Sequence, residues 1–246
     1  VKGKEPTSVR WIDINKGDDE RPNYRSRLVA REIKRDKRDD LFAATPPIEA
    51  PKCVISVWAT AGGGRSVMVN DGSRAFFNAR CLRDVYVQIA DGDFEEGDED
   101  KCGKLEFSMY GTRDAAQNWY HEYTSSLVNL GFIQGRATPC IFRHPQRDII
   151  TYVHGDDYVS AGTPENLAWL KSDLEKSYEI KTEVLGPNEG ETKEVRILNR
   201  IVEWTKEGIR YEADQRHAEI IVRELGLEDS KGCLLYTSDA ADDSLR

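Results

Sequence analysis

A pair of adjacent carboxylates inside a short hairpin pattern constrains the fold of this chain more than any other feature. Residues 148–153 are largely apolar and lead into the segment HGDDYVSAG at residues 154–162. This segment is typical of a strand, a tight turn and a second strand, with Asp156 and Asp157 in the turn. The sequence therefore predicts a hairpin that carries acidic residues at one end.

A third carboxylate follows a different short strand. The apolar residues 67–69 run directly into Asn70 and Asp71, and the stretch AFFNARCL at residues 75–82 is predicted to be helical. Asp71 is therefore expected at the end of a strand.

The rest of the chain alternates extended and helical patterns, as mixed α/β proteins do. Alternating apolar residues predict further strands at residues 9–14, 24–32, 139–143, 195–204 and 208–211. The first two are expected to pair as a hairpin through the polar loop 15–23, and the last two across TKEG. Helical spacing predicts helices from Pro51 to the glycines at 62–64, from Thr112 to Gly131, from Pro164 to Leu174 and from Asp214 to Gly226.

Apolar faces suggest how these helices pack. The first is expected to bury Val54 and Trp58, and Thr163 is expected to cap the third. The third helix carries its apolar face on Leu167, Leu170 and Leu174. The second is predicted to pack through Ala116, Tyr120, Tyr123, Leu127 and Leu130.

Length and composition allow a folded core and suggest no membrane anchor. The chain has 246 residues, 39% of them hydrophobic. No apolar run approaches the roughly 20 residues that span a bilayer, and no leader is visible, so we expect a soluble, untargeted, cytoplasmic protein. The five cysteines are scattered without zinc-site spacing and are expected to be buried thiols.

The net charge of −9 argues at first against a nucleic-acid partner. The charge is unevenly distributed, however, because residues 21–38 are strongly basic and residues 91–100 are strongly acidic. Local phosphate binding by the basic segment is therefore compatible with the sequence, and a solvated charged face is the alternative.

Three carboxylates on rigid strands are the ligands that two-metal phosphoryl transfer requires. Two divalent cations about 3.5–4 Å apart need hard oxygen ligands, so Asp71, Asp156 and Asp157 are candidate ligands for two Mg²⁺ ions, with Mn²⁺ as a possible substitute. A Gly-Asp-Asp segment is also ordinary in hairpin turns, so the motif by itself leaves a structural role open.

Five blocks in order resemble the reverse transcriptase domain of copia-type retrotransposons over residues 8–230. RSRLVARE resembles the family's KARLVAKG, and VNDGSRAFFNARCLRDVYVQIADGDF resembles MDVKTAFLNGxLxExIYMxQPPGF. KLEFSMYGTRDAAQNWYHEYTSSLVNLGF resembles KLxKSLYGLKQAPRxWYxKFxxxLxxLGF, and TYVHGDDYVSAG stands where the family has LYVDDxLIxG. The final segment, LNRIVEWTKEGIRYEADQRHAEIIVRELGL, resembles LGMEIxRxxxGxxLSQxxYxxxLLxxFGM.

The resemblance implies roles for individual residues. Asp71 becomes the first metal carboxylate, with Asp156 and Asp157 as the second pair, and Phe76 falls at the aromatic gate that rejects a ribose 2′-hydroxyl. A core aromatic is the alternative for Phe76. The other implied nucleotide-binding residues are Gly72, Arg74 and Ala75 near the triphosphate, Gly111 near the templating base, and Arg25 and Arg27 as a triphosphate clamp.

The resemblance also implies a right-hand polymerase fold of α/β (α+β) class, with a palm sheet and flanking helices. Residues 1–232 would form the reverse transcriptase domain, with fingers mainly in 1–66, palm mainly in 67–205 including a fingers insertion, and the start of the thumb in 206–232. The implied function is an RNA-directed and DNA-directed DNA polymerase that binds a primed RNA or DNA template and deoxynucleoside triphosphates (dNTPs). The alternative is a non-catalytic relic that at most binds nucleic acid.

The implied setting is a virus-like particle in the cytoplasm. Ribonuclease H and integrase regions of the same polyprotein would be expected, and neither is present in this sequence.

Some positions depart from the family pattern. His154-Gly155 replaces Tyr-x before the two aspartates, so the segment also resembles the Gly-Asp-Asp of RNA-dependent RNA polymerases. Ala116 replaces a proline, and Gly72 replaces a valine. Residues 233–246 have no counterpart in the family and resemble a translated sequencing adapter, so they are expected to be a foreign tail without a fold.

Overall fold

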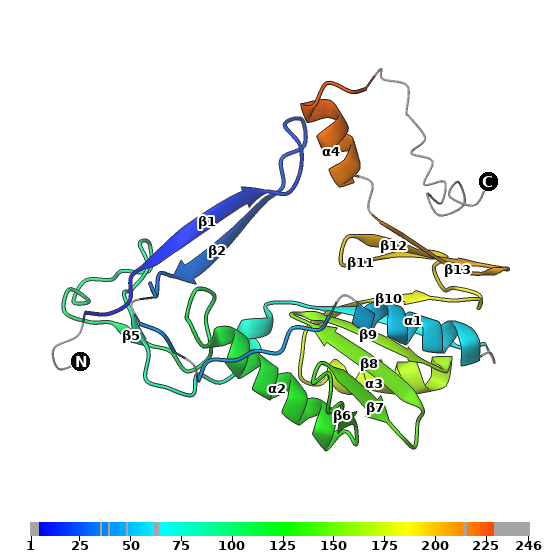
Figure 1. Cartoon of the computed structure of the whole chain (residues 1–246). Coiled ribbons are helices and arrows are strands. Elements are labelled where there is room, and N and C mark those ends of the chain that lie inside the picture. The colour runs from blue at the N-terminus through cyan, green and yellow to red at the C-terminus, as the bar shows by residue number, and fades with distance from the viewer. Residues whose placement is uncertain are drawn as a thin grey trace, which may run out of the picture.

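The computed structural model describes residues 5–34, 36–38, 40–47, 49–61, 64–213 and 216–228. A six-stranded antiparallel sheet lies at the centre of this structure (Figure 1). In spatial order its strands are β10 (Ile180–Leu185), β3 (Ser66–Gly72), β9 (Asp157–Gly162), β8 (Ile149–His154), β7 (Ile141–His144) and β6 (Ile133–Gln134). The predicted hairpin of β8 and β9 is confirmed, and β3 pairs directly with β9.

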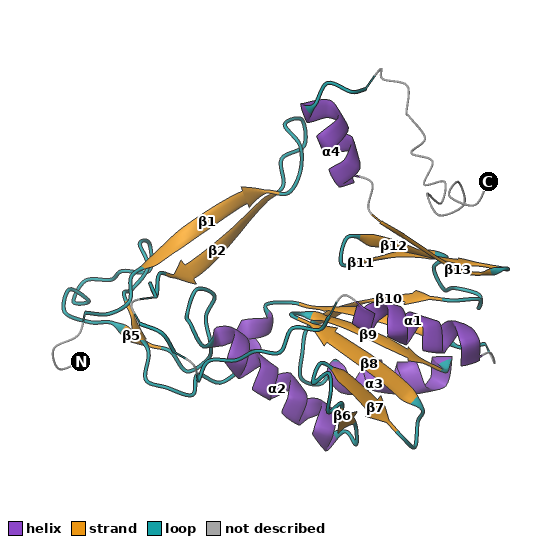
Figure 2. Cartoon of the chain, viewed as in Figure 1, coloured by secondary structure: helices purple, strands orange, loops and turns teal. Residues whose placement is uncertain are grey.

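Helices cover both faces of the central sheet (Figure 2). On one face, α2 (Ala115–Asn129) and α3 (Pro164–Leu174) pack against Met68, Phe142 and Tyr158. On the other face, α1 (Glu49–Ala61) packs with Val54 and Trp58 toward the sheet, as predicted. Full burial of an aliphatic or phenylalanine side chain contributes about 1.5–3 kcal/mol, so these two cores hold the sheet between the helices.

The buried face of α2 differs from the predicted one at its start. Ala115 and Trp119 are buried with Tyr123 and Leu127, whereas Ala116 is exposed. The larger apolar area of Trp119 explains this difference, because its indole ring packs edge-on against Tyr123.

The helix predicted for residues 75–82 is wrong beyond its first turn. A 3-10 helix, η1 (Ala75–Asn78), ends at Ala79, whose backbone is extended. The Ala79 carbonyl oxygen accepts a hydrogen bond from the Ser108 backbone nitrogen at 2.7 Å, and the Cys81 backbone nitrogen donates one to the Glu106 carbonyl oxygen at 2.9 Å. Pairing with a distant segment therefore replaces the helical hydrogen bonds.

A long hairpin of β1 (Val9–Asn15) and β2 (Tyr24–Ala30) projects from the sheet and confirms the predicted pairing (Figure 1). Its base packs through Ala30 onto Val85 and Met109. The small pair β4 (Tyr86–Val87) and β5 (Gly103–Lys104) lies beside this base, because Thr7 bridges to Val87.

The strand predicted for residues 195–204 is split in two. Leu198 and Asn199 have φ angles of 47° and 59°, and this pair of left-handed residues turns the chain back on itself. A three-stranded sheet of β11 (Glu194–Ile197), β12 (Arg200–Thr205) and β13 (Gly208–Ala213) results.

The final helix, α4 (Arg216–Glu224), is present. Its predicted cap at Asp214 lies outside the described residues, as do Cys233 and the segment 233–246. The expectation of buried thiols holds only for Cys140 among the four described cysteines, because Cys53 is exposed and two are half-buried. No helix in the described part of the chain is long and apolar enough to cross a membrane.

Candidate active site

Strand pairing brings the three predicted carboxylates to one end of the central sheet. Asp71 at the end of β3 lies directly opposite Asp157 at the start of β9. The Gly72 backbone nitrogen donates a hydrogen bond to the Asp156 carbonyl oxygen at 2.9 Å. Two segments far apart in sequence therefore meet at this point, and a β-carbon on residue 72 would lie only 3.1 Å from that carbonyl oxygen.

The turn that carries Asp156 is stabilised by a glycine conformation and by a hydrogen bond from α2. Gly155 adopts a left-handed conformation with φ of 62°, which glycine accepts without strain. The Trp119 indole nitrogen donates a hydrogen bond to the Gly155 carbonyl oxygen at 2.7 Å. Helix α2 thus supports the turn from the sheet face opposite α1, although its sequence indicated only packing.

The carboxylates repel one another. Burial, together with the negative charges of Asp156 and Asp71, raises the pKa of Asp157 to about 6. A bound cation would relieve this repulsion, and carboxylate oxygens are the ligands that Mg²⁺ prefers, so the chemistry of these side chains suits a divalent metal. In the described part of the chain, however, no three acidic, His or Cys side chains form a group that could hold a metal ion.

Phe76 lies close to this sheet end, and its position is compatible both with a sugar gate and with a core aromatic. It sits on η1 and is partly buried against the core formed with α2 and α3. Its ring also lies 4.7 Å from the ring of Tyr110, measured between centroids. Ala75 beside it is 2% exposed and belongs to the same core.

Arg74 forms an ion pair with Glu179 and not with one of the three aspartates. It is left-handed, with φ of 53°, and its guanidinium group lies 2.6 Å from the Glu179 carboxylate. Both side chains are well exposed, so Arg74 can exchange this partner for an anionic ligand at low cost.

Gly111 is the point where the β1–β2 hairpin touches the rest of the site. Its φ is 87°, and a β-carbon here would lie 1.9 Å from the Ala30 carbonyl oxygen. The Ala30 backbone nitrogen also donates to the Tyr110 carbonyl oxygen at 2.8 Å. Only glycine allows this approach, so the packing of the hairpin requires glycine at position 111.

Arg25 and Arg27 share one face of β2, as predicted. The Arg27 guanidinium carbon lies 4.9 Å from the centre of the Tyr110 ring. Burial raises the pKa of the Tyr110 hydroxyl. The negative charges of Asp156 and Asp71 raise this pKa further, whereas the positive charges of Arg27 and Arg25 lower it. Tyr110 is therefore influenced both by the basic residues of the hairpin and by the carboxylates of the sheet.

Tyr110 and Trp119 are site residues that the sequence patterns did not single out. Trp119 is in a helix that the sequence indicated to be packing, and no spacing rule distinguishes either residue. A cavity of about 200 Å³ lies beside Trp119, lined among others by Phe76, His154 and Gly155.

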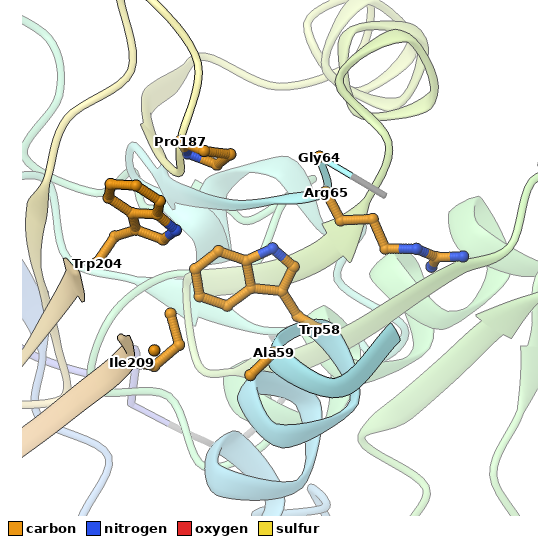
Figure 3. A pocket seen from close by; sticks show the side chains of 8 residues that line it. Trp58, Ala59, Gly64, Arg65, Pro187, Trp204 and Ile209 are labelled. Carbon is orange, nitrogen blue, oxygen red and sulfur yellow. The ribbon is translucent and has the colours of Figure 1, made fainter. Parts of the chain in front are cut away.

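Another cavity, shown in Figure 3, lies away from the carboxylates. Trp58 and Trp204 face each other across it, between the end of α1 and the β12–β13 sheet (Figure 3). Arg65 on its rim precedes β3, whereas Asp71 is six residues further on, a distance of about 20 Å along a strand. This cavity is therefore not part of the carboxylate site.

An antiparallel sheet with helices on both faces and carboxylates at one strand end defines a mixed α/β domain with a candidate catalytic site. The sequence model of the family described as reverse transcriptase (RNA-dependent DNA polymerase) matches residues 1–230. The chain belongs to this family, and the right-hand α/β fold class predicted from the sequence is confirmed.

Curated relatives are retrotransposon polyproteins. The chain is 27% identical over 195 residues to the retrovirus-related Pol polyprotein from transposon TNT 1-94 of Nicotiana tabacum, covering 76% of this chain and 14% of that protein. It is 25% identical over 163 residues to the polyprotein from transposon RE1 of Arabidopsis thaliana, covering 64% and 11%. The chain thus spans at most about a seventh of the length of these two relatives.

Two telomerases are among the similar solved structures. Apo telomerase from Candida tropicalis, truncated from its C-terminal domain, is 9% identical with a TM-score of 0.46, covering 86% of this chain and 56% of that one. Telomerase from Candida albicans in complex with a fragment of telomeric RNA is 9% identical with a TM-score of 0.45, covering 86% and 47%.

Proposed function

We propose that this chain is the polymerase part of a retrotransposon Pol polyprotein and copies RNA and DNA templates into DNA. The observation that carries the proposal is the register of β3 on β9, which sets Asp71 opposite Asp157 and beside the turn with Asp156. Membership of the reverse transcriptase family supports it. In this proposal, residues 1–66 are mainly fingers, 67–205 mainly palm, and 206–232 the start of the thumb.

The proposed metal ligands are Asp71, Asp156 and Asp157. When bound, two Mg²⁺ ions would neutralise the charge that develops on the attacking 3′-hydroxyl and on the leaving pyrophosphate. The chain itself would hold these carboxylates on paired backbone, which limits their movement. Trp119 would keep the turn in place from the other side.

The proposed substrates are a primed RNA or DNA template and dNTPs. Arg25 and Arg27 share one face of β2, and Arg27 lies over the Tyr110 ring, so in this proposal they supply the positive charge that a triphosphate would need. Phe76 is proposed to exclude the ribose 2′-hydroxyl. No observation on the described residues favours a relic without activity.

Primer extension by the full chain tests the proposal. With an RNA template, a DNA primer, dNTPs and Mg²⁺, we expect extension products that disappear when Asp71, Asp156 or Asp157 is replaced with Asn. Each replacement should lower the rate by about a thousandfold or more, because it removes an interaction with the charge of the transition state. Asp93→Asn, in the exposed acidic loop, is the matched control and should keep the wild-type rate.

Extension that persists in Asp157→Asn would contradict the proposal, and so would a folded wild-type chain without any extension. Circular dichroism of each variant separates loss of chemistry from loss of fold.

A further inference from the structure

The Tyr110 ring lies between the β1–β2 hairpin and η1. On one side it packs against Phe76 at 4.7 Å and 44° between ring planes, and against Phe77 at 5.6 Å in an edge-to-face arrangement. On the hairpin side the Arg27 guanidinium carbon lies 4.9 Å from the ring centre. Among the described residues, Tyr110 is thus the one ring that contacts both an arginine of the hairpin and the proposed sugar gate.

The backbone of Tyr110 is fixed to the hairpin. Its carbonyl oxygen accepts a hydrogen bond from the Ala30 nitrogen at 2.8 Å, and the close approach at Gly111 leaves no room for the two segments to slide. The position of Tyr110 is therefore tied to the hairpin backbone, and its ring is in contact with Phe76.

The electrostatic surroundings of Tyr110 come from both sides of the site. The negative charges of Asp156 and Asp71 and the positive charges of Arg27 and Arg25 all act on its hydroxyl group. Charge interactions fall with distance, so Tyr110 feels charges of both signs because the hairpin arginines and the carboxylates both lie in its neighbourhood. A nucleoside triphosphate that bridges these two groups would pass beside this ring.

We propose that Tyr110 is the positioning residue for sugar selection: it holds Phe76 in the orientation that excludes a ribose 2′-hydroxyl and links that orientation to Arg27 of the hairpin. The inference rests on the proposed polymerase function and deepens it. An aromatic ring is needed at this position because it can contact a guanidinium group and a tilted ring at the same time. The hydroxyl group of Tyr110 is not required for this role.

Single-nucleotide incorporation with full chain, primer–template and Mg²⁺ tests the inference. The measured quantity is the ratio of kcat/KM for a dNTP to that for the matching ribonucleotide. Tyr110→Leu should lower this ratio by about tenfold, a change of about 1.4 kcal/mol in differential binding. Tyr110→Phe, which keeps the ring, should retain the wild-type ratio.

A double variant shows whether Tyr110 acts through Phe76. If it does, Tyr110→Leu combined with Phe76→Val should discriminate no worse than Phe76→Val alone, because the two changes remove the same restraint. The matched control is Phe107→Leu, which removes another ring under an arginine, since Arg80 lies 4.8 Å from the Phe107 ring centre. This control should leave the ratio unchanged.

The outcomes separate the two proposals. A wild-type chain without extension would refute the polymerase function itself. An active wild type with an unchanged ratio in Tyr110→Leu, or with additive effects in the double variant, would overturn the role of Tyr110 alone. Thermal melting checks folding, and Tyr110→Met provides a second ring-free variant whose flexible side chain fills a similar space.

Discussion

The Trp119 indole nitrogen donates a hydrogen bond to the Gly155 carbonyl oxygen, and the two atoms are 2.7 Å apart. Trp119 is 2% exposed on α2 and packs edge-on against Tyr123 and Tyr178. Gly155 belongs to the turn between β8 and β9 that precedes Asp156. A buried helix residue therefore limits the movement of the turn that carries the proposed metal ligands.

Replacing Trp119 with Phe keeps most of the packing and removes the hydrogen bond. A net contribution of about 1 kcal/mol is typical of such a bond, so kcat is expected to fall by about fivefold. The KM for the dNTP should stay the same, because Trp119 contacts the turn and not the nucleotide. Trp169→Phe, on α3 beside Arg147, is the control and should affect only thermal stability. Equal kcat values in the two variants would show that the bond does not position the turn.

The pKa of Asp157 predicts how stability depends on pH. Since its pKa rises from 3.8 to about 6 on folding, the folded protein holds this proton more tightly than the unfolded chain does. The contribution of Asp157 to the free energy of unfolding therefore falls as the pH increases from about 4 to about 6, and it is constant above that range. Asp157→Asn, which cannot ionise, should become progressively more stable than the wild type across this window.

Chemical denaturation at several pH values, without divalent cations, measures the difference. Adding Mg²⁺ at pH 7 should stabilise the wild type more than Asp157→Asn, since a cation offsets the repulsion between carboxylates. A stability difference that does not vary between pH 4 and pH 7 would contradict the raised pKa.

Arg83 connects the end of the hairpin to the start of α2. Its guanidinium group lies 2.8 Å from the Asp114 carboxylate and 2.5 Å from that of Glu32. The Asp114 side chain is only 6% exposed, so Arg83→Met would leave a buried carboxylate without its cation and cost about 2–3 kcal/mol. Adding Asp114→Asn should restore part of this loss.

Urea denaturation of the single and double variants provides the test. Arg38→Met breaks the exposed pair with Asp40 and serves as the control, with no measurable change expected. If Arg83→Met and Arg38→Met had equal effects, Arg83 would have no structural role in joining the hairpin to α2.

Gly111→Ala should be more damaging than glycine replacements elsewhere in the chain. At residue 111 the added carbon would lie 1.9 Å from the Ala30 carbonyl oxygen, so the hairpin must move. We expect a loss of about 3 kcal/mol or more and weaker dNTP binding. Gly190→Ala has a similar φ of 81° but open space around it, so it isolates the cost of the backbone conformation. Similar losses in the two variants would show that the contact with Ala30 is unimportant.

Phe76→Val distinguishes a sugar gate from a core aromatic. As a gate, the variant should accept ribonucleotides about tenfold or more readily while its use of dNTPs changes little. Single-nucleotide extension measures this ratio, and Phe94→Val in the exposed acidic loop is the control. Lower thermal stability with unchanged discrimination would assign Phe76 to the core.

Local sequence signals were sufficient where a structure depends on near neighbours along the chain. The hairpin at residues 149–162 follows from two apolar runs around Gly155. The start of α3 follows from Thr163 and Pro164, because the Thr163 hydroxyl oxygen accepts a hydrogen bond from the Asn166 backbone nitrogen. Resemblance between sequences also identified Asp71, Asp156 and Asp157 as a group. It could not show their spatial relation, because no local rule sets the register of β3 on β9.

Tertiary contacts decided the features that depend on distant partners. The helix expected over residues 75–82 stops at Ala79, because residues 106–108 supply other hydrogen bonds. Trp119 takes the place in the core that was expected for Ala116. The position of Tyr110 depends on the contact between the end of β2 and residues 110–111, where the Ala30 backbone bonds to Tyr110 and lies against Gly111. The physical reason is that local signals arise from residues a few positions apart, whereas register, close approach and ring packing are set when separate segments compete for the same buried space.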